Sequence, residues 1–125
     1  MPRSTSLKNS IIDAICNATA FSVATPYISL HTADPGGTGA AECTGGSYAR
    51  QLGSFGAAAT GAASNDANVD FVSMPACTVT YMGVWTAVTV GTWLWGGILT
   101  ASKVVNAGDT FRFAIGNLTL SDVNV

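Results

Sequence analysis

From Tyr27 onward the chain consists of short stretches in which apolar and polar residues alternate, and turns rich in glycine and asparagine separate these stretches. Alternation with a period of two places successive side chains on opposite faces of a β-strand. The pattern is clear in CTVTYMGVWTA from Cys77 and in TFRFAI from Thr110, whereas TWLWGGILTA from Thr92 is almost continuously apolar. About seven to nine such strands predict a mainly β fold, an antiparallel, jelly-roll-like β-sandwich.

The segment before these strands has a different period. Apolar residues recur at helical spacing and form one stripe at Leu7, Ile11, Ile12, Ile15 and Ala18. A hydroxyl of Ser4 or Ser6 can cap this N-terminal helix, which we expect to end near Ala20. The 125 residues suit a single domain, with an arm and helix over residues 1–20 and a sandwich over residues 23–123.

The chain carries few charges. Only 10% of its residues are charged, against about 25% in a typical soluble domain, and its net charge is −2. Its five basic residues are scattered, so we expect no nucleic-acid partner. Two interpretations of the neutral surface stay open. Either this is a small sandwich with an uncharged polar surface, or copies of the chain or a larger assembly cover much of the surface.

The cysteines and the apolar runs further limit the class of protein to which the chain can belong. The three cysteines, Cys16, Cys43 and Cys77, are odd in number and form no C-x-x-C pair, which favours small buried thiols in a reducing compartment over disulfides or zinc. No apolar run is long enough to cross a bilayer, and polar residues interrupt the apolar stretch at residues 1–24. We therefore expect neither a secretory signal nor a membrane partner.

The stretch HTADPGGTGAAECTGGSYARQ, residues 31–51, is the strongest candidate for a functional loop. It follows YISLHT, predicted to be a half-buried strand with Ile28 and Leu30 on one side and Ser29 and His31 on the other. A nucleophilic triad would combine His31 with Cys43 or Ser47 and an acid such as Asp34. However, GGSYA around Ser47 lacks the second glycine of a nucleophile elbow.

Other chemistry fits this loop no better. GTGAAE has no third glycine and precedes no helix, so it is a poor phosphate cradle. Asp34 and Glu42 can reach a calcium ion, but the alternating acidic ladder of a calcium loop is absent. We therefore expect no enzyme activity, no cofactor and no metal. In this interpretation His31 ends a strand and bonds to the loop backbone.

We instead interpret the loop as a rigid scaffold. Its glycines allow positive φ, Asp34 and Pro35 set a turn, and Arg50 can pair with Glu42 or Asp34. The structural loop residues are His31, Asp34, Pro35, Gly36, Glu42, Gly45, Gly46, Tyr48 and Arg50. Stacking of sugars on aromatic rings is an alternative, and its candidates are Trp85, Trp93, Trp95, Tyr48 and Tyr81. Trp93 and Trp95 share one face of an apolar strand, which favours the core for both.

The segment from Tyr27 to Gln51 resembles a family of small phage virion proteins. In that family a hydrophobic strand ends in L-H-T-A-D-P-G, and a G-x-x-E-x-x-G-G-x-Y-A-R-Q run follows. The matching positions here are Leu30 to Gly36, Gly39, Glu42, Gly45, Gly46, Tyr48, Ala49, Arg50 and Gln51. Later elements, G-x-x-x-A from Gly83 and V-x-x-G-D-T-x-x-F from Val105, are also similar. The resemblance covers roughly residues 7–120, and Cys43 departs from it, since an aliphatic residue is usual there.

The resemblance implies a structural protein of the virion, assembled in the host cytoplasm, without catalytic residues. We expect a capsid decoration (cement) protein that binds the major capsid protein on the outer head surface, as a homo-oligomer such as a trimer. Arg3 and Lys8 would then lie on an arm, Met1 to Ser10, that reaches an acidic capsid surface. The alternative is a tail-fibre or tail-tip component that binds tail proteins and contacts the host surface through glycans.

Overall fold

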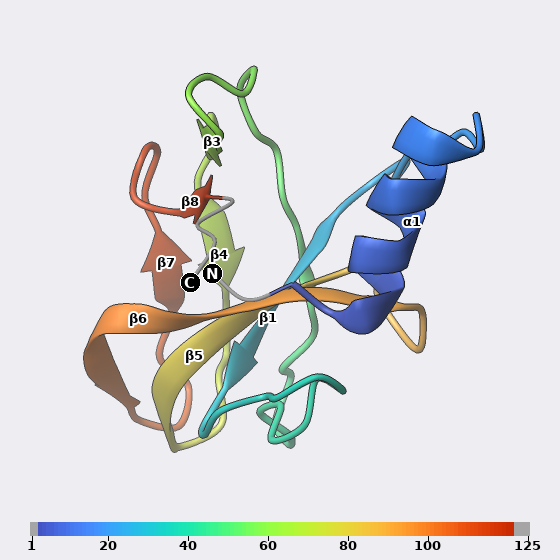
Figure 1. Cartoon of the computed structure of the whole chain (residues 1–125). Helices are drawn as coiled ribbons and strands as arrows, with labels where there is room; N and C mark the ends of the chain where they lie inside the picture. Colours follow the sequence, from blue (N-terminus) through green and yellow to red (C-terminus); the bar gives the residue numbers. More distant parts are fainter. Residues whose placement is uncertain (1–2, 122–125) are drawn as a thin grey trace.

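The computed structural model describes residues 3–121 (Figure 1). Its elements are α1 (Thr5–Cys16), β1 (Tyr27–His31), β2 (Gln51–Leu52), β3 (Ala62–Ser64), β4 (Val69–Phe71), β5 (Cys77–Trp85), β6 (Trp93–Val105), β7 (Phe111–Phe113) and β8 (Thr119–Ser121). The predicted mainly β fold with one N-terminal helix is confirmed, and the eight strands of the described range agree with the predicted number.

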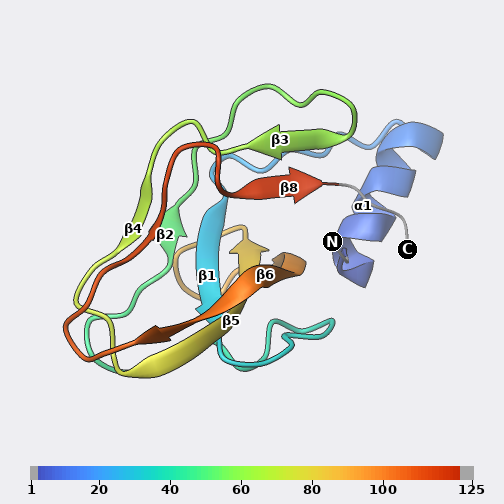
Figure 2. The ribbon, with the colours of Figure 1, turned by 90° about the vertical axis from the view of Figure 1, so that its left-hand side faces the viewer.

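The strands form one larger sheet and two small ribbons. The sheet has the order β2-β1-β5-β6, while β3 pairs with β8 and β4 pairs with β7. Every pairing is antiparallel. The ribbons lie on one side of the sheet and the glycine-rich loop, residues 32–50, lies on the other (Figures 1 and 2). The predicted antiparallel β-sandwich is therefore confirmed, and its second layer is split into two ribbons.

The apolar core lies between the sheet and the ribbons. Ile28 is paired with Val84 and Leu30 with Met82, so these four side chains share the inner face of the sheet. They belong to one buried cluster that also contains Val69, Phe71, Phe111, Phe113 and Leu118. The ring of Phe71 meets those of Phe111 and Phe113 edge to face, with centroids 6.2 and 6.5 Å away.

The outer face of β1 is buried as well, contrary to the predicted half-buried strand. Ser29 and His31 are both fully buried. The reason is that the ring of Trp93 and the glycine-rich loop cover this face. A Cβ atom at Gly83 would overlap the Trp93 ring, and one at Gly39 of the loop would overlap the rings of Trp85 and Trp93. Glycine at these positions lets loop, ring and strand approach closely.

Trp93 and Trp95 lie on opposite faces of the sheet, so their predicted common face is wrong. Val84 is paired with Trp95, but the next residue, Trp85, is paired with Trp93, which leaves Leu94 as an extra residue. This β-bulge reverses the alternation of side chains along β6. Trp93 therefore packs against Trp85, with centroids 5.3 Å apart, while Trp95 lines an apolar groove beside α1.

Helix α1 begins as predicted and ends earlier. The Ser4 hydroxyl accepts a hydrogen bond from the Leu7 N–H (3.1 Å) and caps the helix. The helix ends at Cys16, and Ala18 adopts a left-handed conformation with φ of 53°. Only Leu7 of the helix is buried, while Ile12 and Ile15 are 55% and 77% exposed. No helix in residues 3–121 is long and apolar enough to cross a membrane.

Residues 3–10, the described part of the predicted N-terminal arm, lie against β6 and in helix α1, and their contact with a capsid stays a prediction. Arg3 forms a β-bridge with Trp95, and the Ser4 N–H donates to the Leu94 carbonyl (2.7 Å). Lys8 then lies on the helix. The chain is docked here because Leu7 enters the core and the backbone of residues 3 and 4 pairs with β6. Met1 and Pro2 lie outside the described residues.

Candidate functional site

The glycine-rich loop folds back along the strand from which it emerges. His31 forms a β-bridge with Glu42, the Thr32 N–H donates to the Ala41 carbonyl (3.0 Å), and the Cys43 N–H donates to the Leu30 carbonyl (2.8 Å). These backbone bonds extend β1 at its end. They also bring the loop back against the sheet, where the Arg50 guanidinium lies over the Trp85 ring and Cys43 enters the core.

The turn predicted at Asp34 and Pro35 is present. The Asp34 carboxylate accepts from the Gly36 N–H (2.8 Å), and the Pro35 carbonyl accepts from the N–H groups of Gly39 and Ala40. Gly36 and Gly39 have φ of 59° and 78°, a region that favours glycine. Further on, Gly45 and Gly46 also have positive φ, and Gly46 lies against Pro75.

Arg50 is the centre of the loop's polar contacts. Its guanidinium donates two hydrogen bonds to the Glu42 carboxylate, both 3.0 Å, so Glu42 and not Asp34 is its partner. It also donates to the carbonyls of Ala87 (3.1 Å) and Val90 (2.8 Å) in the β5–β6 turn. The guanidinium carbon lies 3.6 Å from the centroid of the Trp85 ring. The Arg50 and Glu42 side chains are only 10% and 20% exposed.

Tyr48 connects the same carboxylate to the central strand. Its hydroxyl donates to Glu42 (2.8 Å) and accepts from the Leu30 N–H (3.0 Å). Burial raises the pKa of Tyr48 far above its ordinary value, and the Glu42 charge adds to the effect. The phenol is therefore protonated at any physiological pH and serves as a fixed bridge between loop and sheet.

His31 belongs to a chain of four hydrogen-bonded groups. The Trp85 indole N–H donates to the Ser29 hydroxyl (3.0 Å), which contacts His31 Nε2 (2.7 Å), while His31 Nδ1 contacts the Ala40 carbonyl (2.7 Å). A carbonyl only accepts, so Nδ1 carries the proton, and Nε2 accepts the proton of the Ser29 hydroxyl. One neutral tautomer satisfies every group, which agrees with the predicted bond between His31 and the loop backbone.

The arrangement differs from that of a nucleophilic triad. Both ring nitrogens of His31 are occupied by Ser29 and Ala40, and the candidate acid Asp34 holds the Gly36 N–H. Cys43 contacts Cys77, with 3.5 Å between the sulfur atoms, and not His31. Within residues 3–121, no three His, Cys, Asp or Glu side chains gather as a set of metal ligands.

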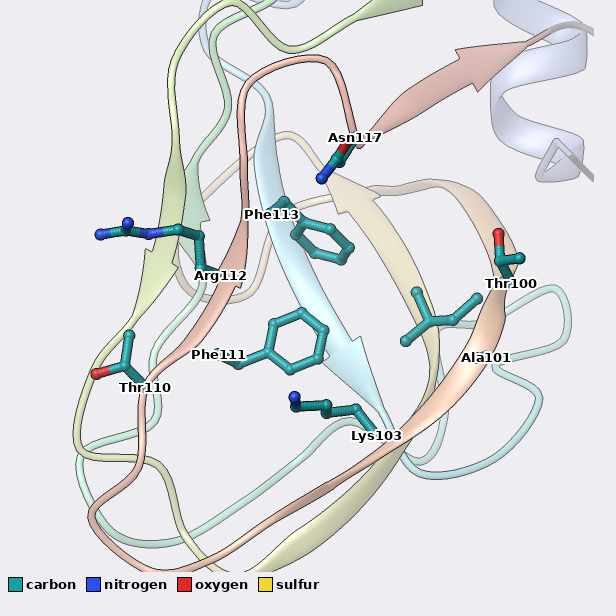
Figure 3. Close-up of a pocket in the computed structure, with 9 residues that line it drawn as sticks. Thr100, Ala101, Lys103, Thr110, Phe111, Arg112, Phe113 and Asn117 are labelled. Atoms are coloured by element: carbon teal, nitrogen blue, oxygen red, sulfur yellow. The ribbon is translucent and has the colours of Figure 1, made fainter.

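A surface cavity that the sequence did not indicate lies between β6 and β7 (Figure 3). Val79 is paired with Lys103 and Tyr81 with Ile98, so one residue of β5 faces four residues of β6. The surplus residues bulge outward and leave a cavity of about 430 Å³. It is lined by Leu99, Thr100, Ala101, Lys103, Thr110, Phe111, Arg112, Phe113 and Asn117.

The cavity combines apolar walls with polar donors. Figure 3 shows the rings of Phe111 and Phe113 and the Lys103 ammonium facing the space between the strands, whereas Arg112 points away. Arg112 instead forms a bidentate pair with Asp70 (2.6 and 3.0 Å), which lowers the pKa of Asp70. None of the described residues that line the cavity is acidic. Lys103 therefore gives it a positive charge.

Buried hydrogen bonds thus hold the loop on the sheet of the β-sandwich, and comparison with protein families gives the class of protein. The family model described as podophage GP4 fiber I protein gp80 matches residues 2–121. The chain belongs to this family and is a bacteriophage virion protein of the fibre type. No curated protein matches it.

The buried histidine predicts a loss of stability in acid. Burial lowers the pKa of His31 below its ordinary 6.5; the Ala40 bond and Glu42 oppose this shift, and Arg50 adds to it. Below about pH 6.5 the unfolded chain takes up a proton that the folded chain resists, so stability falls as pH falls, by up to about 1.4 kcal/mol per unit. Above that pH His31 contributes no slope.

Urea unfolding of the protein between about pH 8 and pH 5.5 measures this slope. His31 is the only histidine in the chain, so His31→Gln should flatten the curve in this range. An equal slope in the variant, or a flat curve in the parent protein, would contradict the assignment.

Arg50→Ala should destabilise the fold by about 3 kcal/mol, because it leaves the part-buried Glu42 carboxylate without its partner. Arg112→Ala is the matched control. It removes a bidentate pair of the same type whose side chains are 55% and 34% exposed, so the expected loss is much smaller. Chemical denaturation of both variants gives the comparison, and equal losses would show that Arg50 has no special role.

Proposed function

We propose that the protein is a component of a phage tail fibre or tail tip that contacts the host surface. The observation that carries this proposal is the match of nearly the whole chain to a fibre protein family. The same match favours a fibre over capsid decoration. We further propose that the protein acts by binding and assembly without catalysis, since its one histidine serves as a structural link between β1 and the loop.

Two features of the described residues support a place in an assembly. The first is the outward face of α1, where Ile12 and Ile15 are exposed, since large apolar side chains on a helix surface are typical of contact regions. The second is the docking of residues 3–10 on the sheet and in the helix. Residues 3–10 therefore form part of a fixed surface that can contact another virion protein.

The place in the particle is tested by copy number. We expect purified virions to contain this protein at a small percentage of the amount of major capsid protein, measured by quantitative mass spectrometry. A fibre or tail tip is present in few copies, whereas a decoration protein follows the symmetry of the head. A ratio near one, or a simple fraction such as one third, would contradict the fibre assignment and restore capsid decoration.

The cavity of Figure 3 is our candidate for the host-contacting site. Its volume of about 430 Å³ suits one or two sugar rings. Phe111 and Phe113 supply apolar walls, while Lys103, Thr100 and Asn117 supply hydrogen-bond donors. Because no acid among the described lining residues balances Lys103, we propose that the preferred ligand is a saccharide carrying a carboxylate or phosphate.

Lys103→Ala should weaken binding to acidic saccharides about tenfold, the loss expected for one charge-assisted hydrogen bond. Lys8→Ala is the matched control, because it removes the same charge from the exposed face of α1. Binding is measured on an array of acidic glycans and their neutral analogues, with the melting temperature as a check on folding. Absence of glycan binding, or equal weakening by both variants, would contradict the site.

A further inference from the structure

The three cysteines are far apart in the sequence, but two of them meet in the fold. Cys43 belongs to the glycine-rich loop, Cys77 is the first residue of β5, and 34 positions separate them along the chain. Their sulfur atoms lie 3.5 Å apart. Cys16, by contrast, is exposed on α1.

The backbone around the two thiols is already held together. The Cys43 N–H donates to the Leu30 carbonyl (2.8 Å), and the Ser47 N–H donates to the Ser73 carbonyl (3.4 Å). Gly46 packs against the backbone of Pro75. Residues 45–47 therefore lie against residues 73–75 near both thiols, and the 3.5 Å between the sulfurs is a short gap to close to a disulfide bond.

We propose that Cys43 and Cys77 form a reversible disulfide that fastens the glycine-rich loop to the start of β5. The oxidant is a small disulfide such as oxidised glutathione, which the virion meets when it leaves the reducing cytoplasm of its host. The proposal concerns the loop and is independent of the proposed saccharide site.

The reaction consists of two thiol–disulfide exchanges. The Cys77 thiolate attacks one sulfur of oxidised glutathione, which forms a mixed disulfide and releases one glutathione thiolate. Cys43 then loses its proton, and its sulfur attacks the Cys77 sulfur and expels the second glutathione. One oxidised glutathione is consumed, two reduced glutathiones are released, and the protein gains one disulfide.

Burial distinguishes the roles of the two thiols. Cys43 is only 3% exposed, whereas Cys77 is half-buried and accessible to the oxidant. Burial, followed by the hydrogen bond with Cys77, raises the pKa of Cys43 to about 12. The Cys43 thiol therefore resists direct attack on the oxidant, and it reacts as the second, intramolecular partner.

The effect on the fold follows from the enclosed segment. A bond between Cys43 and Cys77 closes a ring that contains Arg50, Tyr48 and strands β2, β3 and β4. Closing such a ring restricts the unfolded chain and stabilises the folded one. Oxidation would thus strengthen the scaffold of the loop once the particle is outside the cell.

The test uses the full-length Cys16→Ser variant, which leaves only the two thiols of interest. The reduced protein is incubated with oxidised glutathione, unfolded and labelled with a maleimide. We expect two labels before oxidation and none after it, with trypsin releasing the segments 9–50 and 51–103 as one linked species. The melting temperature should rise by about 5 °C or more on oxidation.

The Cys16→Ser/Cys77→Ser variant is the control and should show no such rise. Cys43→Ala in the same background provides a second control if the first folds poorly. The proposal is overturned if both thiols remain open to maleimide, if Cys77 keeps a glutathione adduct without closing the ring, or if the bond forms without a rise in melting temperature.

Discussion

The outer layer of this protein depends on the ion pair between Arg50 and Glu42. An arginine and a carboxylate that are this little exposed lose much of their hydration, and the pair is stabilising only if its remaining hydrogen-bonding groups are satisfied. These groups are satisfied here, because Arg50 also donates to two carbonyls of the β5–β6 turn and Glu42 also accepts from Tyr48. The Trp85 ring beneath the guanidinium completes the enclosure. Arg50 thereby joins the loop, the Trp85 ring of β5 and a turn about forty residues away along the chain.

The same layer explains why β1 is buried on both faces. Its inner face contributes Ile28 and Leu30 to the core, and its outer face carries Ser29 and His31 under Trp93 and the loop. Buried polar groups are tolerated only when they are hydrogen-bonded, and the chain from the Trp85 indole to the Ala40 carbonyl meets that requirement with neutral groups. The loop is thus a packed layer of the sandwich. Such a fixed loop suits a virion protein of the fibre type.

Two irregularities in the pairing of β6 with β5 place different features on the two sides of the molecule. The bulge at Leu94 sends Trp93 under the loop and Trp95 toward α1, and the larger bulge opposite Thr80 opens the cavity beside β7. Neither is visible in the sequence, because a continuous apolar run such as WLWGGIL fits several registers equally well. The predicted apolar stripe of α1 is likewise buried only in part. Helical spacing predicts which residues share a face, but only Leu7 is buried and Ile11 packs against the core, whereas Ile12 and Ile15 are exposed.

The sequence by itself determined the local features of this protein: the strand pattern, the Ser4 cap, the turn at Asp34 and Pro35, and the mainly β class. These depend on contacts between residues close in the chain or on side-chain period, which a sequence displays directly. It also narrowed the partner of Arg50 to two acids. Only the tertiary structure decided that the partner is Glu42, that Cys43 meets Cys77, and that a cavity opens between β6 and β7. Each of these depends on which strands pair and in which register. That choice is made by packing of the whole core, and no single segment encodes it.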